Sequence, residues 1–229
     1  MEKEMIYVSQ LGRVPYQEAL DLQLKLHQKR VKGEIPDVLL LLEHPSVITI
    51  GKSGHDQNIL YPDSVLEENG ISVVRINRGG DVTYHGPGQL VGYPIFHILS
   101  YGKGVRDFVT QMEEVFIHLL DTHFGITARR DSQYTGVWVE DAKITAMGFE
   151  IRKYVSMHGF AFNVTTDLTQ FRWINPCGII GKGVTSLSRL TEREIDMGIV
   201  SDQMIQSFHH VFELTMEEVD PSLIYEMAG

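Results

Sequence analysis

The run of five aliphatic residues from Val38 to Leu42 is the feature that most restricts how this chain can fold. It is bounded by Asp37 and Glu43. An uninterrupted apolar run of this length is typical of a strand covered on both faces. Five residues are far short of the ~20 that a membrane-spanning helix needs. We therefore expect a sheet with helices packed on both of its faces, and no membrane association.

Helices are predicted around this strand. Apolar residues recur at helical spacing over residues 15–32 and 105–120, and again in a helix that begins near Ser201 as its N-cap. Gly33 and Gly125 follow the first two segments and predict where those helices end. Helices of this kind, each with one apolar face, would cover the predicted sheet.

Strands are predicted between the helices, over residues 38–42, 71–76, 90–96, 137–139, 143–149 and 155–164. Two of them form a predicted hairpin joined at Glu140-Asp141-Ala142. Strands outnumber helices and cluster in the middle of the chain, which favours a mixed α/β (α+β) fold with an antiparallel portion over a regular βαβ array. Because no linker or repeat interrupts the sequence, we expect residues 1–229 to form a single domain.

Composition excludes several classes of function. The 229 residues carry a net charge of −10, which argues against general nucleic-acid binding because that needs a basic footprint. The chain has one cysteine and no predicted secretory signal, so we expect a protein of the reducing cytoplasm. No histidine pair has metal-ligand spacing, and we expect no metal.

A glycine-rich segment, residues 78–89 with the sequence RGGDVTYHGPGQ, follows a predicted strand. Its spacing matches neither a dinucleotide fingerprint nor a P-loop. One interpretation is a purely structural loop. The other is a strip of free backbone N–H groups that binds a carbonyl or an acyl chain, with Arg78 and His85 as polar handles.

Cys177 and Lys143 are the candidate reactive residues. Pro176 and Gly178 flank the cysteine and predict a turn that could present the thiol, although a free cysteine is more often buried and inert. Lys143 opens a predicted strand, where a lysine is usually solvated. Because the residues that follow it are small and apolar, its ammonium could instead point into a cleft.

The motifs of this chain, taken in order, resemble those of the lipoyl(octanoyl) transferase family, the octanoyltransferases of lipoate biosynthesis. The resemblance spans about residues 5–190, whereas the predicted C-terminal helix and tail, 200–229, carry no family motif. One departure is Asn175, where the family often has an aliphatic residue. The matching motifs are His44-Pro45, Thr49-Ile50-Gly51, Arg78-Gly79-Gly80, Thr83 to Gln89, Thr135 to Trp138, Lys143-Ile144 with Gly148, His158-Gly159 with Asn163, Asp167-Leu168, Pro176 to Ile179, and Val184 to Leu187.

The resemblance implies a fold like the catalytic domain of biotin and lipoate protein ligases, with a mixed sheet, flanking helices and a smaller second sheet. It implies transfer of an octanoyl (or lipoyl) group from acyl carrier protein to a specific lysine of lipoyl domains, on 2-oxoacid dehydrogenase acyltransferase subunits or the glycine-cleavage H protein. It implies no cofactor, and we expect a monomer.

The resemblance also implies residue roles. Cys177 would carry the acyl group as a thioester, and Lys143 would pair with it. The residues implied in acyl binding form three segments: Arg78, Gly79, Gly80, Asp81, Val82, Thr83, Tyr84 and His85; then Ala146, Met147 and Gly148; then His158, Gly159 and Phe160.

This chemistry suits the residue types. A thiol with a pKa of ~8.5 is only slightly ionised at neutral pH, and a nearby ammonium such as that of Lys143 would stabilise the thiolate. Neutral Lys143 could then accept a proton from the incoming amine. Transfer from a thioester to an amine runs downhill, so no nucleotide is needed. Burial of about six methylenes, at ~0.8 kcal/mol each, would contribute ~5 kcal/mol and could select chain length.

Three alternatives stay open on the sequence. An ATP-dependent lipoate or biotin ligase on the same fold would need ATP but no cysteine. A non-catalytic scaffold would bind carrier proteins and form no acyl-enzyme. A cysteine thioesterase would release free octanoate to water. Dependence on ATP, intact mass and product analysis distinguish them.

Overall fold

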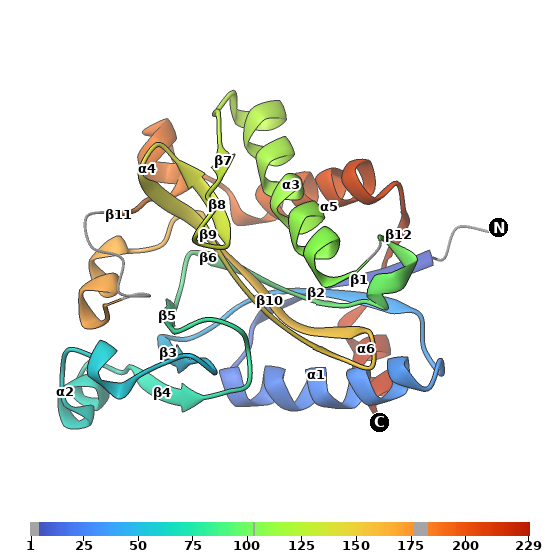
Figure 1. Ribbon diagram of the computed structural model, residues 1–229, viewed down its shortest axis with the longest axis horizontal. Helices are drawn as coiled ribbons and strands as arrows, with labels where there is room; N and C mark the ends of the chain where they lie inside the picture. Colours follow the sequence, from blue (N-terminus) through green and yellow to red (C-terminus); the bar gives the residue numbers. More distant parts are fainter. Residues whose placement is uncertain (1–4, 103, 176–182) are drawn as a thin grey trace.

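The computed structural model describes residues 5–102, 104–175 and 183–229, and these form two β-sheets with helices around them (Figure 1). The larger sheet has β11 (Gly183–Val184) beside β9, and its other strands lie in the spatial order β12 (Thr215–Glu218), β1 (Met5–Arg13), β2 (Asp37–Glu43), β6 (Gln89–Ile95), β10 (Val155–Asn163), β9 (Ala142–Arg152), β8 (Gly136–Val139) and β7 (Arg129–Arg130). The smaller sheet has the order β4 (Ser72–Arg75), β3 (Val47–Ile50) and β5 (Val82–His85).

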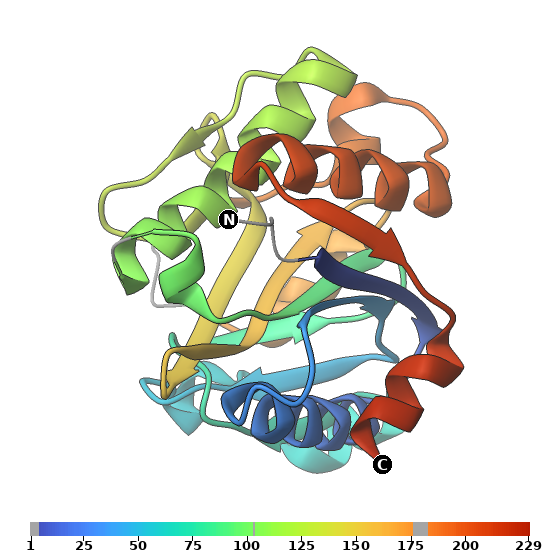
Figure 2. The same ribbon diagram turned by 90° about the vertical axis from the view of Figure 1, so that its right-hand side faces the viewer.

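The larger sheet is mixed, as predicted. β12, β1 and β2 are parallel neighbours, whereas β6, β10, β9, β8 and β7 follow one another antiparallel. The predicted hairpin is β8–β9, although Ala142 already belongs to β9. Pairing of β12 with β1 places the last strand of the chain beside the first (Figure 2).

Helices cover both faces of the larger sheet, which confirms the inference from the aliphatic run. One face carries α1 (Tyr16–Val31) and α6 (Pro221–Ala228), and the other carries α3 (Val105–Phe124) and α5 (Met197–Phe212) (Figures 1 and 2). Along β2, Leu39 and Leu41 pack in the cluster that contains α3 and α5. The alternate residues Val38, Leu40 and Leu42 pack in the cluster that contains α1 and α6.

The helix boundaries follow the predictions at two of three places. α1 lies within the predicted segment, and α3 ends at Gly125, which has a left-handed φ of 65°. The predicted start of the third helix at Ser201 is wrong. α5 begins at Met197, where the Asp196 side chain accepts the N–H of Ile199 at 3.0 Å, and Ser201 is buried within the helix. Asp196 is the cap because the apolar face already begins at Val200.

The smaller sheet packs its own core beside the larger one. Ile48, Ile50, Val82 and Trp173 lie in this core, together with Leu66. The short elements of the chain are α2 (Asp63–Glu68), α4 (Leu187–Thr191), and the 3₁₀ turns η1 (Asp56–Asn58), η2 (Ile98–Ser100) and η3 (Leu168–Trp173). Among the residues that the structure describes, every helix is too short or too polar to cross a membrane.

Candidate functional site

A cavity of about 580 Å³ lies where the glycine-rich loop meets β9 and β10, and this volume is within the range of small-molecule sites. Residues of all three predicted acyl-binding segments line it, and so does Lys143. From the predicted set, the lining residues are Arg78, Gly79, Gly80, Asp81, Val82, Thr83, His85, Ala146, Met147, Gly148, His158, Gly159 and Phe160. The fold thus brings together segments that are about 80 positions apart in the sequence.

Tyr84 is the member of the predicted set that does not line this cavity. Its ring is buried in the core of the smaller sheet and lies edge-on to Phe171. Its hydroxyl is 2.9 Å from the hydroxyl of Ser46. Because neighbouring residues of a strand point to opposite faces, Tyr84 faces away from the cavity while Thr83 and His85 face it.

Cys177 lies outside the described residues, within 176–182. On the near side of this gap, the N–H of Asn175 donates to the carbonyl of Asn58 at 2.8 Å. On the far side, β11 runs parallel to β9 with Val184 paired to Lys143. Gly183 and Val184, six and seven positions after Cys177, therefore lie directly beside Ala142 and Lys143.

Lys143 is a partly exposed residue that lines the cavity. It donates a hydrogen bond to the carbonyl of Thr135 at 3.1 Å and lies 4.8 Å from the centre of the Trp138 ring. A carbonyl oxygen and an aromatic face both attract a cation.

Arg78 braces the glycine-rich loop. It is buried, and its guanidinium donates to the carbonyl oxygens of Gly79 at 3.0 Å and Asp81 at 2.7 Å, as well as to Thr49. The Gly79 N–H donates to the carbonyl of Phe149 at 3.0 Å, so it is not one of the free donors that the second interpretation of this loop requires. The loop lies so close to β9 that a Cβ on Gly148 would stand 2.6 Å from the Gly79 oxygen.

Asp81 joins this loop to the segment that precedes Cys177. Its carboxylate accepts the N–H of Val82 at 2.8 Å, the side-chain amide of Asn58 at 2.6 Å and the N–H of His55 at 3.3 Å. Because Asn58 in turn receives the N–H of Asn175, Asp81 holds the point from which the chain enters 176–182.

His85 starts a chain of buried side-chain hydrogen bonds. Its Nδ1 is 2.8 Å from the amide oxygen of Gln89, whose amide nitrogen donates to the Asn163 oxygen at 2.9 Å. Asn163 donates to the carbonyl of Thr185 at 3.1 Å. Burial, with the nearby charges of His44 and Arg78, lowers the pKa of His85 to about 3. The imidazole is therefore neutral at physiological pH.

His158 adopts an unusual backbone conformation in the middle of β10, with a φ of 56°. Its N–H leaves the sheet ladder and donates to the Gln23 amide oxygen of α1 at 2.9 Å. Burial lowers the pKa of His158 to about 4. Non-glycine residues hold such a conformation only where the surroundings impose it, and such positions cluster at functional sites.

Sequence reasoning missed several residues of the cavity. Tyr16 and Tyr93 line it, and burial raises the pKa of both hydroxyls. The Tyr93 hydroxyl is 2.6 Å from Nε2 of His44, whose pKa burial lowers to about 4. Tyr93 stands in an apolar strand and Tyr16 on an amphipathic helix, so neither position is distinguishable from a core position by its spacing. Among the described residues, no group of three or more His, Cys, Asp or Glu could hold a metal ion.

Comparison with solved structures agrees with this architecture. A bi-partite lipoate protein ligase from Thermoplasma acidophilum superposes with a TM-score of 0.73 at 16% identity, over 100% of this chain and 91% of that one. The biotin protein ligase from Aquifex aeolicus gives a TM-score of 0.52 at 10% identity, over 91% and 69%. The fold is therefore that of the lipoate and biotin protein ligase catalytic domains, as expected.

Sequence comparison narrows this class. Residues 15–209 match the family model of the lipoyl protein ligase A/B catalytic domain. Proteins named octanoyltransferase are similar along nearly the whole chain: one from Desulforamulus reducens is 45% identical over 98% of both chains, and one from Caldicellulosiruptor saccharolyticus is 50% identical over 90% of this chain and 88% of its own. The chain belongs to the octanoyltransferase family, whose members are acyltransferases of lipoate biosynthesis.

Proposed function

We propose that this protein transfers an octanoyl group from acyl carrier protein to a specific lysine of lipoyl domains, through a thioester on Cys177. The observation that carries the proposal is the pairing of β11 with β9 at Lys143. Gly183 is six positions after Cys177, and six residues span at most about 20 Å. A connection of this length allows the thiol of Cys177 to reach Lys143, as the proposal requires.

The reaction has two balanced steps. In the first, the Cys177 thiolate attacks the carbonyl carbon of the donor thioester, the C–S bond to the carrier breaks, and the carrier thiolate leaves with the proton of the Lys143 ammonium, which becomes the neutral amine. In the second, the acceptor amine attacks the Cys177 thioester, so that a C–N bond forms, the C–S bond breaks and the thiolate returns. Lys143 as ammonium stabilises the thiolate in the first step, and as neutral amine it takes the proton of the acceptor in the second.

The cavity suits an acyl chain. Ala146, Met147 and Phe160 give it apolar walls, and Gly79 and Gly148 let the loop pack closely against β9. The described part of the wall also holds His85 and His158, and His44 lies behind it against Tyr93, with pKa values of about 3 to 4. Imidazoles with pKa values this low are weak bases, so Lys143 is the proposed proton acceptor.

Intact-mass spectrometry tests the proposal. After incubation with octanoyl-carrier protein and without ATP, the enzyme should gain one octanoyl group, and a lipoyl domain added afterwards should remove it. Cys177→Ser should gain none, and Lys143→Ala should acylate slowly whereas Lys143→Arg keeps part of the rate of the first step. A requirement for ATP, or free octanoate as the product, would assign the protein to a ligase or a thioesterase instead.

A further inference from the structure

One peptide group, between Thr135 and Gly136, is held from both ends. Its carbonyl oxygen accepts a hydrogen bond from Lys143 Nζ at 3.1 Å. Its N–H donates to the carboxylate of Glu113 at 2.9 Å. Because a peptide group is planar and trans, these two partners lie on opposite sides of it. A carboxylate and an ammonium thus face each other across a single amide.

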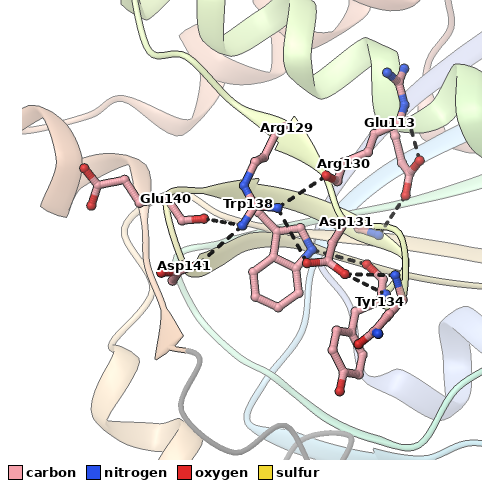
Figure 3. Close-up of polar contacts among 10 residues, drawn as sticks. Glu113, Arg129, Arg130, Asp131, Tyr134, Trp138, Glu140 and Asp141 are labelled. Carbon is pink, nitrogen blue, oxygen red and sulfur yellow. Dashed lines mark hydrogen bonds and ion pairs between the residues drawn. The ribbon is translucent and has the colours of Figure 1, made fainter.

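Glu113 is a buried acid, 6% exposed, on α3. One of its oxygens is 3.4 Å from Nε of Arg130, which Figure 3 shows beside it. Burial raises the pKa of Glu113, and the Gly136 N–H and the charges of Arg130 and Lys143 act against that rise. Lys143 is therefore within electrostatic reach of this carboxylate. A buried carboxylate is costly and is retained only where its partners compensate.

Gly136 makes the orientation of this peptide group adjustable. Its φ of 127° is one that other residues rarely adopt, and a Cβ there would stand 2.4 Å from the Thr145 oxygen and 3.5 Å from Lys143 Cε. The glycine lets the Lys143 side chain pass close to the backbone, but it also leaves the peptide little hindered from rotating. The hydrogen bond to Glu113 removes that freedom.

The loop before Gly136 is braced around the same lysine. The Asp131 carboxylate accepts the N–H of Gln133 at 2.9 Å and of Tyr134 at 3.2 Å. The Tyr134 carbonyl accepts the Trp138 indole N–H at 3.2 Å (Figure 3), and the centre of the Trp138 ring lies 4.8 Å from Lys143 Nζ. The loop is therefore shaped to present the Thr135 carbonyl to Lys143.

We propose that Glu113 is a positioning residue for Lys143, acting through the Thr135–Gly136 peptide. It turns the Thr135 carbonyl toward the amine, and its negative charge favours the ammonium form. The inference rests on the proposed function, since positioning matters only if Lys143 takes part in the transfer.

Two substitutions separate geometry from charge. Glu113→Gln keeps an oxygen that can accept the Gly136 N–H but removes the charge, whereas Glu113→Leu removes both. Glu114→Gln is the matched control, because Glu114 is the next residue and also pairs with Arg130 but does not touch the peptide. Thermal melting confirms that each variant is folded.

Competitive labelling of Lys143 with acetic anhydride, measured by peptide mass spectrometry across pH, reports the state of the amine directly. In Glu113→Gln, labelling should begin at a lower pH than in the wild-type protein. In Glu113→Leu, kcat for transfer to a lipoyl domain should also fall at least about tenfold, with KM changed less than about twofold. Glu114→Gln should match the wild-type protein in both measurements.

Identical labelling curves in the wild type and Glu113→Gln would overturn the inference, as would equal effects of the Glu113 and Glu114 substitutions. The labelling readout does not depend on turnover. If the wild-type enzyme gained no octanoyl group on Cys177, the proposed function would fail by itself, while the labelling experiment would still decide whether Glu113 acts on Lys143.

Discussion

Arg78 and Thr49 are joined by three hydrogen bonds. Nε and Nη2 of the arginine donate to the threonine hydroxyl at 3.1 and 3.0 Å, and Nη2 also donates to its carbonyl at 2.8 Å. Thr49 belongs to β3 of the smaller sheet, whereas Arg78 starts the loop that lines the cavity. The pair therefore fixes the loop to the smaller sheet, so the guanidinium of Arg78 has a structural role in the site.

Arg78→Lys should destabilise the protein although it keeps the charge. An ammonium cannot reproduce the fork of donors that reaches Thr49, Gly79 and Asp81 together, and buried carbonyl groups would lose their partners. We expect a loss of about 2–4 kcal/mol in the free energy of unfolding, measured by urea denaturation. Thr49→Val should lose part of this and Thr49→Ser little. Equal stability of Arg78→Lys and the wild type would contradict this account.

Gly148→Ala should disturb the loop from the opposite side. The added methyl group would stand 2.6 Å from the Gly79 oxygen and 3.4 Å from Arg78 Cδ, so the loop or β9 must move. Overpacking of this kind costs about 1–3 kcal/mol, and we expect octanoyl transfer to fall more than stability does. Gly198→Ala is the control, because its methyl group meets only the Asp196 side chain, at 3.1 Å. Full activity of Gly148→Ala would show that the loop is free to shift.

The elements that were predicted well are those specified by local periodicity. The aliphatic run of β2 has side chains that alternate between two cores, and α3 ends where glycine allows a left-handed residue. The start of α5 was misplaced because Ser201 and Asp196 are both capping residue types, and only packing decides between them. At such positions the sequence offers more than one capping residue, and tertiary contacts determine where the helix begins.

The site was predictable in its segments but not in its contacts. Which way Arg78 points depends on Thr49, 29 positions away, and the conformation of His158 depends on Gln23, 135 positions away. Glu113 meets Gly136 only because α3 packs against β8. Such pairs leave no periodic pattern in one sequence, so a buried polar residue on an apolar helix face gives no sign of its partner.

Acid should destabilise the folded protein over a window set by its buried histidines. Burial lowers the pKa of His44 and His158 from 6.5 to about 4, and that of His85 to about 3. Because these pKa values are lower in the folded state, the unfolded chain binds more protons than the folded chain at mildly acidic pH. The contribution of these histidines to the free energy of unfolding is fully present above pH 6.5, and it decreases as the pH falls from 6.5 toward about 4.

Urea unfolding between pH 5 and 7 measures this dependence above the range in which most carboxylates titrate. His158→Asn should reduce the slope, because asparagine tolerates a positive φ but does not titrate. A free energy of unfolding that stays level from pH 7 to pH 5 in the wild type would contradict the expected burial of neutral imidazoles.

Gln89→Leu should break the hydrogen-bonded connection between His85 in the cavity wall and the chain that follows Cys177. Gln89 accepts from His85 and donates to Asn163, which itself donates to the Thr185 carbonyl. Leucine fills a similar volume but leaves His85 Nδ1 and the Asn163 oxygen without this partner, at a cost of about 1–3 kcal/mol. Because Thr185 also donates its N–H to the Lys143 carbonyl, the loss should reach the strand pair β11–β9.

Two measurements check this expectation. Urea denaturation of Gln89→Leu should give the lower free energy of unfolding, and alkylation of Cys177 by iodoacetamide should change in rate because the chain after the cysteine is less firmly held. Gln170→Leu is a matched control, since Gln170 bonds only within its own 3₁₀ turn, to Asp167 and Trp173, among the described contacts. If both variants alter the alkylation rate equally, the buried path through Asn163 is not what connects His85 to the reactive segment.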